Sequence, residues 1–177
     1  MPLGLVVHSG RILTAKLLLG LTSEGITHCA IGDGDASFID PRQPPPPDVN
    51  QTTLKHECAR KKFYKRTFLK EDPLGTLLVN GISYTETDEE SNIIACFFRF
   101  DETEANDITI KEYGFFGGGV TYLEEVDSDL ALNGVFNKIT NRKGQVRDPG
   151  YLYEIKNIPD FNKIADTRLE LVGIIKI

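Results

Sequence analysis

A strand pattern that ends in a run of glycines, at residues 107–119, sets the class of fold open to this chain. The segment has the sequence DITIKEYGFFGGG, in which Ile108, Ile110 and Tyr113 stand among polar residues. Spacing of this kind predicts a β-strand, and the glycines accept the positive φ that a tight turn requires. They lack the Lys-Ser/Thr pair of a phosphate-binding loop, so we interpret Gly114–Gly119 as a hairpin turn.

Most of the remaining chain shows strand patterns as well. Asn92–Phe100 is apolar on both faces, which predicts a central strand buried on both sides. A hairpin is expected over Leu77–Tyr84, because Asn80-Gly81 favours a two-residue turn. The other strand-like segments are Ile26–Gly32, Arg60–Leu69 and Arg168–Ile177, while Asp127–Asp148 is rich in turn signals. We therefore predict a mainly β chain: one antiparallel β-sandwich-like domain over residues 1–177, with one short N-terminal helix and long loops.

The expected helix lies near the N-terminus. Ser9 can cap a helix over Gly10–Leu19, and Gly20 fits the position after its end. Apolar residues crowd most of this helix, which is too short to be stable unless another part of the protein covers it. Our main interpretation is that the core of the domain covers the helix; a bare helix surface would instead be a docking site for a neighbouring subunit.

The loop Asp33–Asn50 holds four successive prolines, Pro44, Pro45, Pro46 and Pro47. Such a run forms an extended left-handed helix without backbone donors, so it cannot join the interior of a sheet. We interpret it as a stiff strut on the surface or as an arm that contacts a neighbouring protein.

Charge is distributed unevenly along the chain. The net charge of −6 argues against nucleic-acid binding, because a basic face normally supplies most of that affinity. Lys55–Lys70 holds seven Lys or Arg and one Glu, whereas Glu86–Asp129 holds thirteen Asp or Glu and two Lys or Arg. These segments either pair within the chain or form a bipolar surface that orients neighbouring subunits. The interface candidates are Arg60, Lys61, Lys62, Tyr64 and Arg66, together with the four prolines.

The sequence contains no set of residues that predicts catalysis, a cofactor or a metal. Cys29, Cys58 and Cys96 form no CxxC pair, so we interpret each as a buried thiol in a reducing compartment. An EF-hand counted from Asp33 fails, because its sixth and twelfth positions hold Phe38 and Pro44. The three histidines lie in different predicted elements, and the nucleophile motif G-x-S-x-G is absent.

The chain also lacks the marks of a membrane protein. No basic residues precede the apolar segment Leu3–Val7, and no small-residue cleavage site follows it. No apolar run approaches the ~20 residues of a transmembrane helix. We therefore expect synthesis in a cytosol and no direct insertion into a membrane.

Four motifs occur in a fixed order: ITHCAIGDG from Ile26, LKHECARKKFYKRTFL from Leu54, VNGISYTET from Val79 and ITIKEYGFFGG from Ile108. This order resembles the N-terminal domain of the phage tail-collar fibre family, found in tailed phages and in phage-like contractile injection systems. The resemblance covers about residues 9–120, and we expect residues 121–177 to be a β-rich C-terminal extension of the same domain.

The resemblance implies a structural virion protein without catalysis. It predicts a baseplate or tail-fibre attachment protein, an adaptor between baseplate wedge and tail fibre. Its partners would be other tail, baseplate and fibre proteins, with homo-oligomers in the assembled particle. Assembly would occur in the cytoplasm of the host bacterium. Family fibres often continue into a trimeric shaft, which this sequence does not contain, so a fibre-joining component is favoured over the receptor-binding fibre.

Two alternatives stay open from sequence. One is a short receptor- or carbohydrate-binding tail protein, although the usual aromatic platform is thin because tryptophan is absent. The other is a hydrolase of cell-wall polymer, for which Glu57 and Glu112 are the candidate carboxylates.

Overall fold

The computed structural model describes residues 4–79, 81–122 and 146–177. Within them the chain forms one helix and twelve strands. The helix is α1 (His8–Leu18). The strands are β1 (Leu5–Val6), β2 (Ile26–Gly32), β3 (Glu57–Lys62), β4 (Lys65–Glu71), β5 (Leu77–Val79), β6 (Ile82–Thr87), β7 (Ile93–Phe100), β8 (Ile108–Gly117), β9 (Thr121–Tyr122), β10 (Val146–Asp148), β11 (Tyr151–Lys163) and β12 (Leu169–Lys176).

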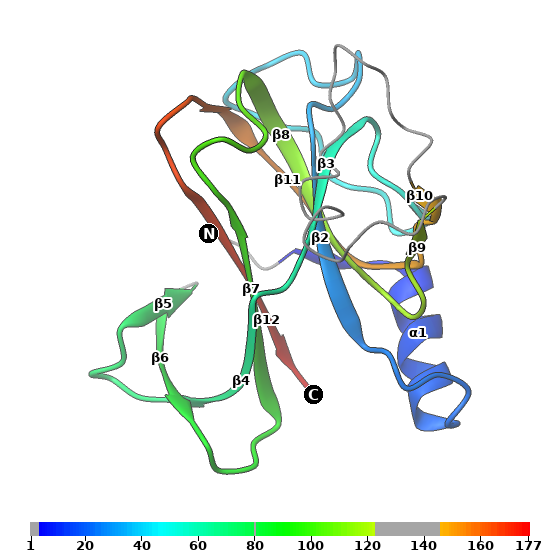
Figure 1. Ribbon diagram of the computed structural model, residues 1–177, viewed down its shortest axis with the longest axis vertical. Helices are drawn as coiled ribbons and strands as arrows, with labels where there is room; N and C mark the ends of the chain where they lie inside the picture. Colours follow the sequence, from blue (N-terminus) through cyan, green and yellow to red (C-terminus); the bar gives the residue numbers. More distant parts are fainter. Residues whose placement is uncertain (1–3, 80, 123–145) are drawn as a thin grey trace.

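The strands form two five-stranded antiparallel sheets (Figure 1). The first sheet has the order β1-β11-β8-β2-β3 and the second the order β12-β7-β4-β6-β5, while β9 and β10 form a separate pair. The predicted fold class, mainly antiparallel β in a sandwich-like arrangement with a short N-terminal helix, is confirmed. The predicted hairpin also forms, since Val79 pairs with Ile82 across β5 and β6.

The predicted single strand over Arg60–Leu69 is wrong, because the chain passes from one sheet to the other at its middle. The Phe63 amide donates to the Thr27 carbonyl of the first sheet at 3.0 Å. The next amide, from Tyr64, donates to the Phe97 carbonyl of the second sheet, also at 3.0 Å. Two adjacent residues therefore join the two sheets through backbone hydrogen bonds.

The main core lies between the sheets and centres on stacked aromatic rings. Phe98 of β7 and Phe115 of β8 are fully buried, with ring centroids 5.3 Å apart. The other face of β7 contributes Ile93 and Ala95 to a second cluster, with Leu69 of β4. This confirms that β7 is a central strand with apolar residues buried on both faces.

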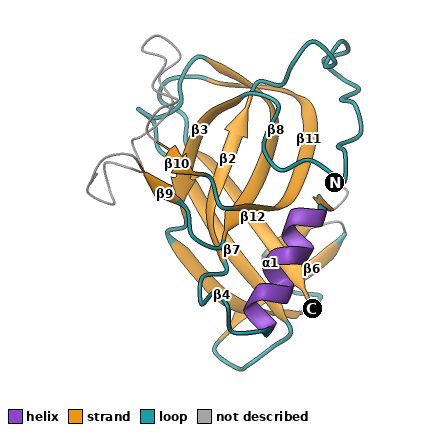
Figure 2. Cartoon of the chain, turned by 90° about the vertical axis from the view of Figure 1, so that its right-hand side faces the viewer, coloured by secondary structure: helices purple, strands orange, loops and turns teal. Residues whose placement is uncertain are grey.

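The outer face of the first sheet carries its own apolar cluster. Val7, just before α1, and Leu54, before β3, pack there against Phe116 and Leu152. The helix lies beside β11 at this face (Figure 2). It begins one residue before the predicted cap: Val7 is the N-cap residue, and the Ser9 hydroxyl instead donates to the Leu152 carbonyl at 2.6 Å. The prediction that Ser9 caps the helix is therefore wrong, because β11 offers that hydroxyl a buried acceptor.

The loop with the four prolines is fixed to the chain's own surface. The Asp160 amide donates to the Pro41 carbonyl at 2.8 Å, and the Asn157 side-chain amide donates to the Pro45 carbonyl at 2.8 Å. At its far end, the Val49 carbonyl accepts from the His8 amide at 2.9 Å. These contacts support the interpretation of a surface strut, held along β11 and the start of α1.

Two further predictions from sequence concern the turn-rich segment and membrane insertion. Most of the turn-rich segment, residues 127–145, lies outside the described residues. In the described part of the chain, no helix has the combination of length and apolar character needed to span a membrane.

Candidate functional site

The exposed side of α1 carries a group of large apolar side chains that the fold leaves uncovered. We call it the α1 surface; it consists of Ile12, Leu17 and Leu18 of the helix and of Leu19 and Leu21, which follow it. Leu18 and Leu19 are 84% and 72% exposed. The main interpretation from sequence, in which the core covers the helix, is therefore wrong for most of its apolar residues, and docking at this surface stays a prediction.

This exposure follows from how the helix is anchored. It contacts the sheet through a narrow line of small residues, Ser9 and Gly10, plus the buried Leu13. A Cβ atom at Gly10 would lie 2.2 Å from the Tyr153 carbonyl oxygen, so the helix backbone nearly touches β11. Lys16 adds a hydrogen bond from its Nζ to the Tyr151 hydroxyl at 2.9 Å. The remaining helix circumference faces away from the sheet.

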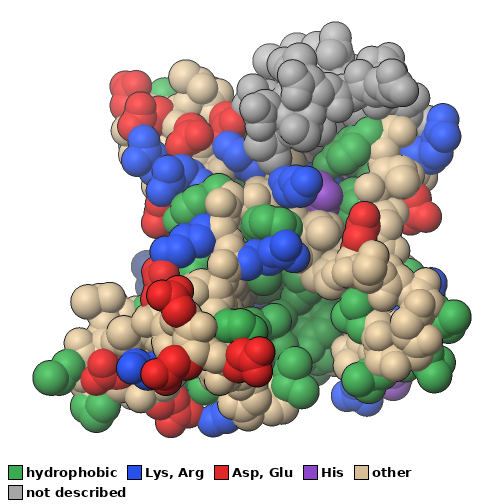
Figure 3. Space-filling view, turned by 60° about the horizontal axis from the view of Figure 1, so that its bottom comes forward, with side chains coloured by type: hydrophobic (Ala, Val, Ile, Leu, Met, Phe, Trp, Pro, Cys, Tyr) green, Lys and Arg blue, Asp and Glu red, His purple; other side chains and the backbone are tan. Residues whose placement is uncertain are grey.

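Figure 3 shows that the α1 side of the molecule borders a hollow. In Figure 1 the β5–β6 hairpin and α1 lie apart from each other in the lower part of the view. Figure 3 shows the molecule with this lower end turned toward the viewer. Hydrophobic side chains gather on the floor of the hollow, and Lys and Arg side chains lie next to it. An apolar floor beside basic side chains suits the binding of another protein chain.

Two of the predicted interface residues, Arg60 and Lys61, are buried in contacts within the chain. The Arg60 guanidinium binds both Glu57 carboxylate oxygens, at 2.8 and 2.7 Å, and donates to the Pro149 carbonyl at 2.7 Å. Lys61 forms an ion pair with Glu104 and lies 3.6 Å from Asp101. Their charges therefore serve the fold of this chain.

The other three basic-strand candidates, Lys62, Tyr64 and Arg66, are exposed. The Arg66 guanidinium lies 4.1 Å from the centre of the Phe63 ring, and the Arg99 guanidinium lies 4.4 Å from the Tyr64 ring. Such cation–π contacts hold long cationic side chains in place. We call Lys62, Tyr64 and Arg66 the basic strip.

Some opposite charges of the basic segment Lys55–Lys70 and the acidic segment Glu86–Asp129 pair with each other within the chain. Lys61 of the basic segment pairs with Glu104 of the acidic segment, and Lys65 pairs with Glu86. These contacts support the interpretation of internal pairing for both lysines. Of the prolines, Pro44, Pro45 and Pro47 are half-buried and Pro46 is exposed.

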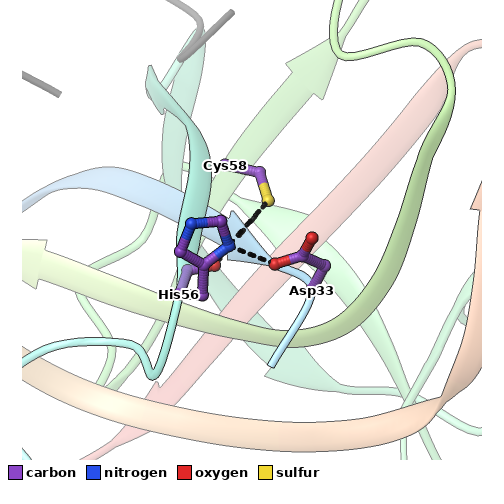
Figure 4. A group of neighbouring side chains, drawn as sticks. All are labelled: Asp33, His56 and Cys58. Atoms are coloured by element: carbon purple, nitrogen blue, oxygen red, sulfur yellow. Dashed lines mark hydrogen bonds and ion pairs between the residues drawn. The ribbon is translucent and has the colours of Figure 1, made fainter. Parts of the chain in front are cut away.

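Asp33, His56 and Cys58 form a cluster that the sequence analysis did not find (Figure 4). Their ligand-type atoms all lie within 4.8 Å of one another. The His56 Nδ1 atom contacts an Asp33 carboxylate oxygen and lies 3.9 Å from the Cys58 sulfur. One signal was present: His56-x-Cys58 places two side chains on one face of a strand, and Asp33 follows the strand that pairs with it.

A buried carboxylate fixes the backbone beneath this cluster. Both Glu112 oxygens accept backbone amides, from His56 at 2.9 Å and from Lys55 at 3.1 Å. Burial raises the pKa of Glu112, and these two hydrogen bonds act against that rise. Glu112 therefore accepts two backbone amides and Glu57 pairs with Arg60, so both carboxylates considered for hydrolysis have partners within the chain.

A family model described as "Baseplate wedge 3 tail fiber network component" matches residues 5–177. No curated protein matches the chain. The family match covers the strands of both sheets, α1 and the segment with the three-residue cluster.

Proposed function

Because the chain belongs to the baseplate wedge 3 tail fibre network component family, we propose that it is an adaptor joining the baseplate wedge to the tail fibres. The chain is a structural component of a phage baseplate and tail fibre system, as the motif order indicated, and its place is the tail of the virion. The family description does not name the tail collar. The joining role is the part that we propose.

The observation that carries this proposal is the exposed α1 surface. Burying one large aliphatic side chain contributes about 1.5–3 kcal/mol, so a surface with four leucines and one isoleucine favours association. Large apolar side chains that a folded protein leaves exposed together mark a candidate site of contact with another protein. We assign this surface to one of the two sides of the adaptor, and substitutions on it decide between the fibre side and the wedge side.

An adaptor needs a second contact area, and the basic strip supplies a candidate. The side chains of Lys62 and Arg66 both lie over the Phe63 ring. Tyr64, which stands between them in sequence, is exposed. Tyr and Arg are enriched among residues that dominate binding energy at protein interfaces. A partner with an acidic surface would match this strip and gain a faster encounter at low ionic strength.

The role that we propose requires no bond to be made or broken. Glu57 and Glu112, the two carboxylates considered for hydrolysis, are engaged by Arg60 and by backbone amides. We also propose that several copies act together in the particle and that assembly occurs in the cytoplasm of the host bacterium.

Co-purification tests this proposal. The chain would be co-expressed with the wedge proteins, with the fibre proteins, and with both sets encoded near its gene, and native mass spectrometry would count the subunits. We expect the chain to form a defined complex with the wedge proteins alone and with the fibre proteins alone. When both sets are present, we expect one complex in which the chain joins wedge to fibre. A chain that stays alone in all three mixtures contradicts the proposal, and specific binding to a glycan array in the same preparation would favour the carbohydrate-binding alternative.

A further inference from the structure

We propose that Asp33, His56 and Cys58 bind one divalent transition-metal ion of the Zn²⁺ class. The three side chains come from the junction of two paired strands: Asp33 follows β2, His56 precedes β3, and Cys58 is its second residue. Their sulfur, nitrogen and oxygen atoms all lie within 4.8 Å of one another. Ligand atoms at 2.0–2.3 Å from a tetrahedral ion lie about 3.3–3.7 Å apart, so small side-chain adjustments suffice.

The geometry at the histidine ring favours a metal over a catalytic triad. In a triad the acid orients one ring nitrogen while the other nitrogen faces the nucleophile. In this cluster a single nitrogen, Nδ1 of His56, faces both the Asp33 carboxylate and the Cys58 sulfur (Figure 4). These groups bind a metal in their deprotonated forms, so an ion placed among the three atoms would displace the protons that they hold.

The donor set indicates which ions fit. One thiolate, one imidazole and one carboxylate are the ligands of zinc sites, whereas Ca²⁺ and Mg²⁺ prefer oxygen alone. Three protein ligands leave one tetrahedral position for water or for a side chain of a neighbouring protein. Cys58 is fully buried, while the His56 and Asp33 side chains are 34% and 18% exposed. An ion can therefore enter from the side of His56.

The sheet holds the three ligands in place before any ion binds. The Asp33 amide donates to the His56 carbonyl at 3.2 Å, which continues the β2–β3 ladder past its last strand pair. Glu112 holds the His56 amide from beneath. A Cβ atom at Gly32 would lie 2.5 Å from the His56 carbonyl oxygen, so only glycine lets the two strands come this close.

The site closes the base of the loop that carries the prolines. Asp33 stands at the start of this connection, and His56 and Cys58 stand at its end, where β3 begins. A metal that joins both ends of the loop binds the folded chain, in which the sheet holds the ligands together, in preference to the unfolded chain, in which they are far apart. Bound metal is therefore expected to stabilise the fold and to fix the strut at its root.

Metal titration of the purified chain tests the proposal. After removal of metal with a chelator, Zn²⁺ and Co²⁺ would be added separately, with Ca²⁺ as a comparison. We expect one equivalent of Zn²⁺ to bind and to raise the melting temperature. Co²⁺ should give the charge-transfer absorption of a thiolate bond, and Ca²⁺ should produce neither effect.

Variants distinguish this site from unspecific binding. Removing a second-shell group typically weakens metal binding 10–100-fold, so loss of a ligand in Cys58→Ala or His56→Gln should weaken Zn²⁺ binding by about 100-fold or more. Cys96→Ala, which removes another buried thiol, is the matched control and should bind as the parent does. If Cys58→Ala fails to fold, His56→Gln alters a part-exposed side chain and decides the question. Unchanged Zn²⁺ affinity in His56→Gln, or no Zn²⁺ binding by the parent, overturns the proposal.

Discussion

At the scale of single residues, the charged and ionisable groups inside this protein determine much of its stability. Lys61 is buried beside Glu104, and Arg60 is buried between Glu57 and the Phe116 ring. A buried charge is costly without a partner, so removal of one member leaves the other uncompensated. The position of each charge relative to the core, which sequence does not state, decides its effect on stability.

The contrast between Lys61 and Lys62 gives the first prediction. Lys61→Ala should lower the free energy of unfolding by about 3–5 kcal/mol, because it strands the buried Glu104 carboxylate. Lys62→Ala, at the exposed neighbouring position, should change it by about 0.5 kcal/mol or less. Urea denaturation of the three proteins measures both values. Equal effects of the two substitutions would show that the Lys61 pair is not a buried one.

His28 gives the second prediction, which concerns pH. Burial, followed by the nearby charges of Arg60 and Lys62, lowers the pKa of His28 from 6.5 to about 3. Between these values the unfolded chain binds the proton and the folded chain does not. The contribution of neutral His28 is therefore complete above about pH 6.5 and is lost as the pH falls toward 3, by up to about 1.4 kcal/mol per pH unit.

Substitution of His28 isolates this effect. The parent and His28→Gln would be unfolded by urea at a series of pH values from 7 to 4, and the difference between their stabilities would be plotted. We expect the variant to lose less stability on acidification, with His8→Gln, at an exposed position, following the parent. Parallel curves for the parent and His28→Gln would contradict a buried neutral imidazole.

At the scale of secondary structure, close backbone contacts fix where elements lie. Gly10 lets α1 approach the Tyr153 carbonyl, and at Gly117 of β8 a Cβ atom would lie 1.9 Å from the Gly25 carbonyl oxygen. Alanine favours a helix over glycine by about 1 kcal/mol. At Gly10, helix propensity therefore favours alanine, whereas packing against β11 favours glycine. The stability of an alanine variant shows which effect is larger.

The third prediction follows from that opposition. Gly10→Ala should destabilise the protein, because the added methyl group pushes α1 away from β11 and breaks the Ser9 hydrogen bond to Leu152. Gly25→Ala is a matched control, since the space around a Cβ atom there is open. Thermal unfolding followed by circular dichroism compares them. A higher melting temperature for Gly10→Ala would mean that propensity outweighs the contact.

Sequence patterns predicted some of the secondary-structure elements correctly and others not. Strand patterns located β2 with its bounds, because it keeps an apolar face toward the core. The interpretation of Gly114–Gly119 as a turn is wrong for its first part: Gly114–Gly117 belong to β8 and pair with β2 and β11, and positive φ begins only at Gly118.

Strand patterns also failed at Arg60–Leu69, since alternation does not record which sheet a strand joins, and the crossing at Phe63 and Tyr64 depends on backbone partners elsewhere. The cluster of Asp33 and His56 was missed for the same reason: strand pairing brings the two residues together across a long loop.

At the scale of the whole molecule, the basic residues divide into those that pair within the chain and those that stay on the surface, a division that the sequence alone does not show. Sequence left both internal pairing and an interface open for the basic segment; Arg60 and Lys61 are buried in contacts within the chain, while Lys62 and Arg66 remain on the surface. Reversal of Lys61 together with Lys62 would therefore disturb folding as well as binding. The motif order, in contrast, identified the phage baseplate and tail fibre class correctly, because a family shares an ordered set of strands and turns.

The final prediction separates the two proposed contact areas without damage to the fold. Leu18→Asp with Leu19→Asp places two charges on exposed positions at the C-terminal end of α1, where Leu19 is the C-cap residue, and Lys62→Glu with Arg66→Glu reverses the basic strip. Each pair should leave the melting temperature close to that of the parent, because none of these side chains is buried. If the chain joins wedge to fibre, each pair should weaken one of the two binary complexes by about tenfold or more in affinity, while the other complex keeps the affinity of the parent. Loss of both complexes from one pair of substitutions would place both partners on a single surface, and retention of both by each pair would exclude the α1 surface and the basic strip as contacts.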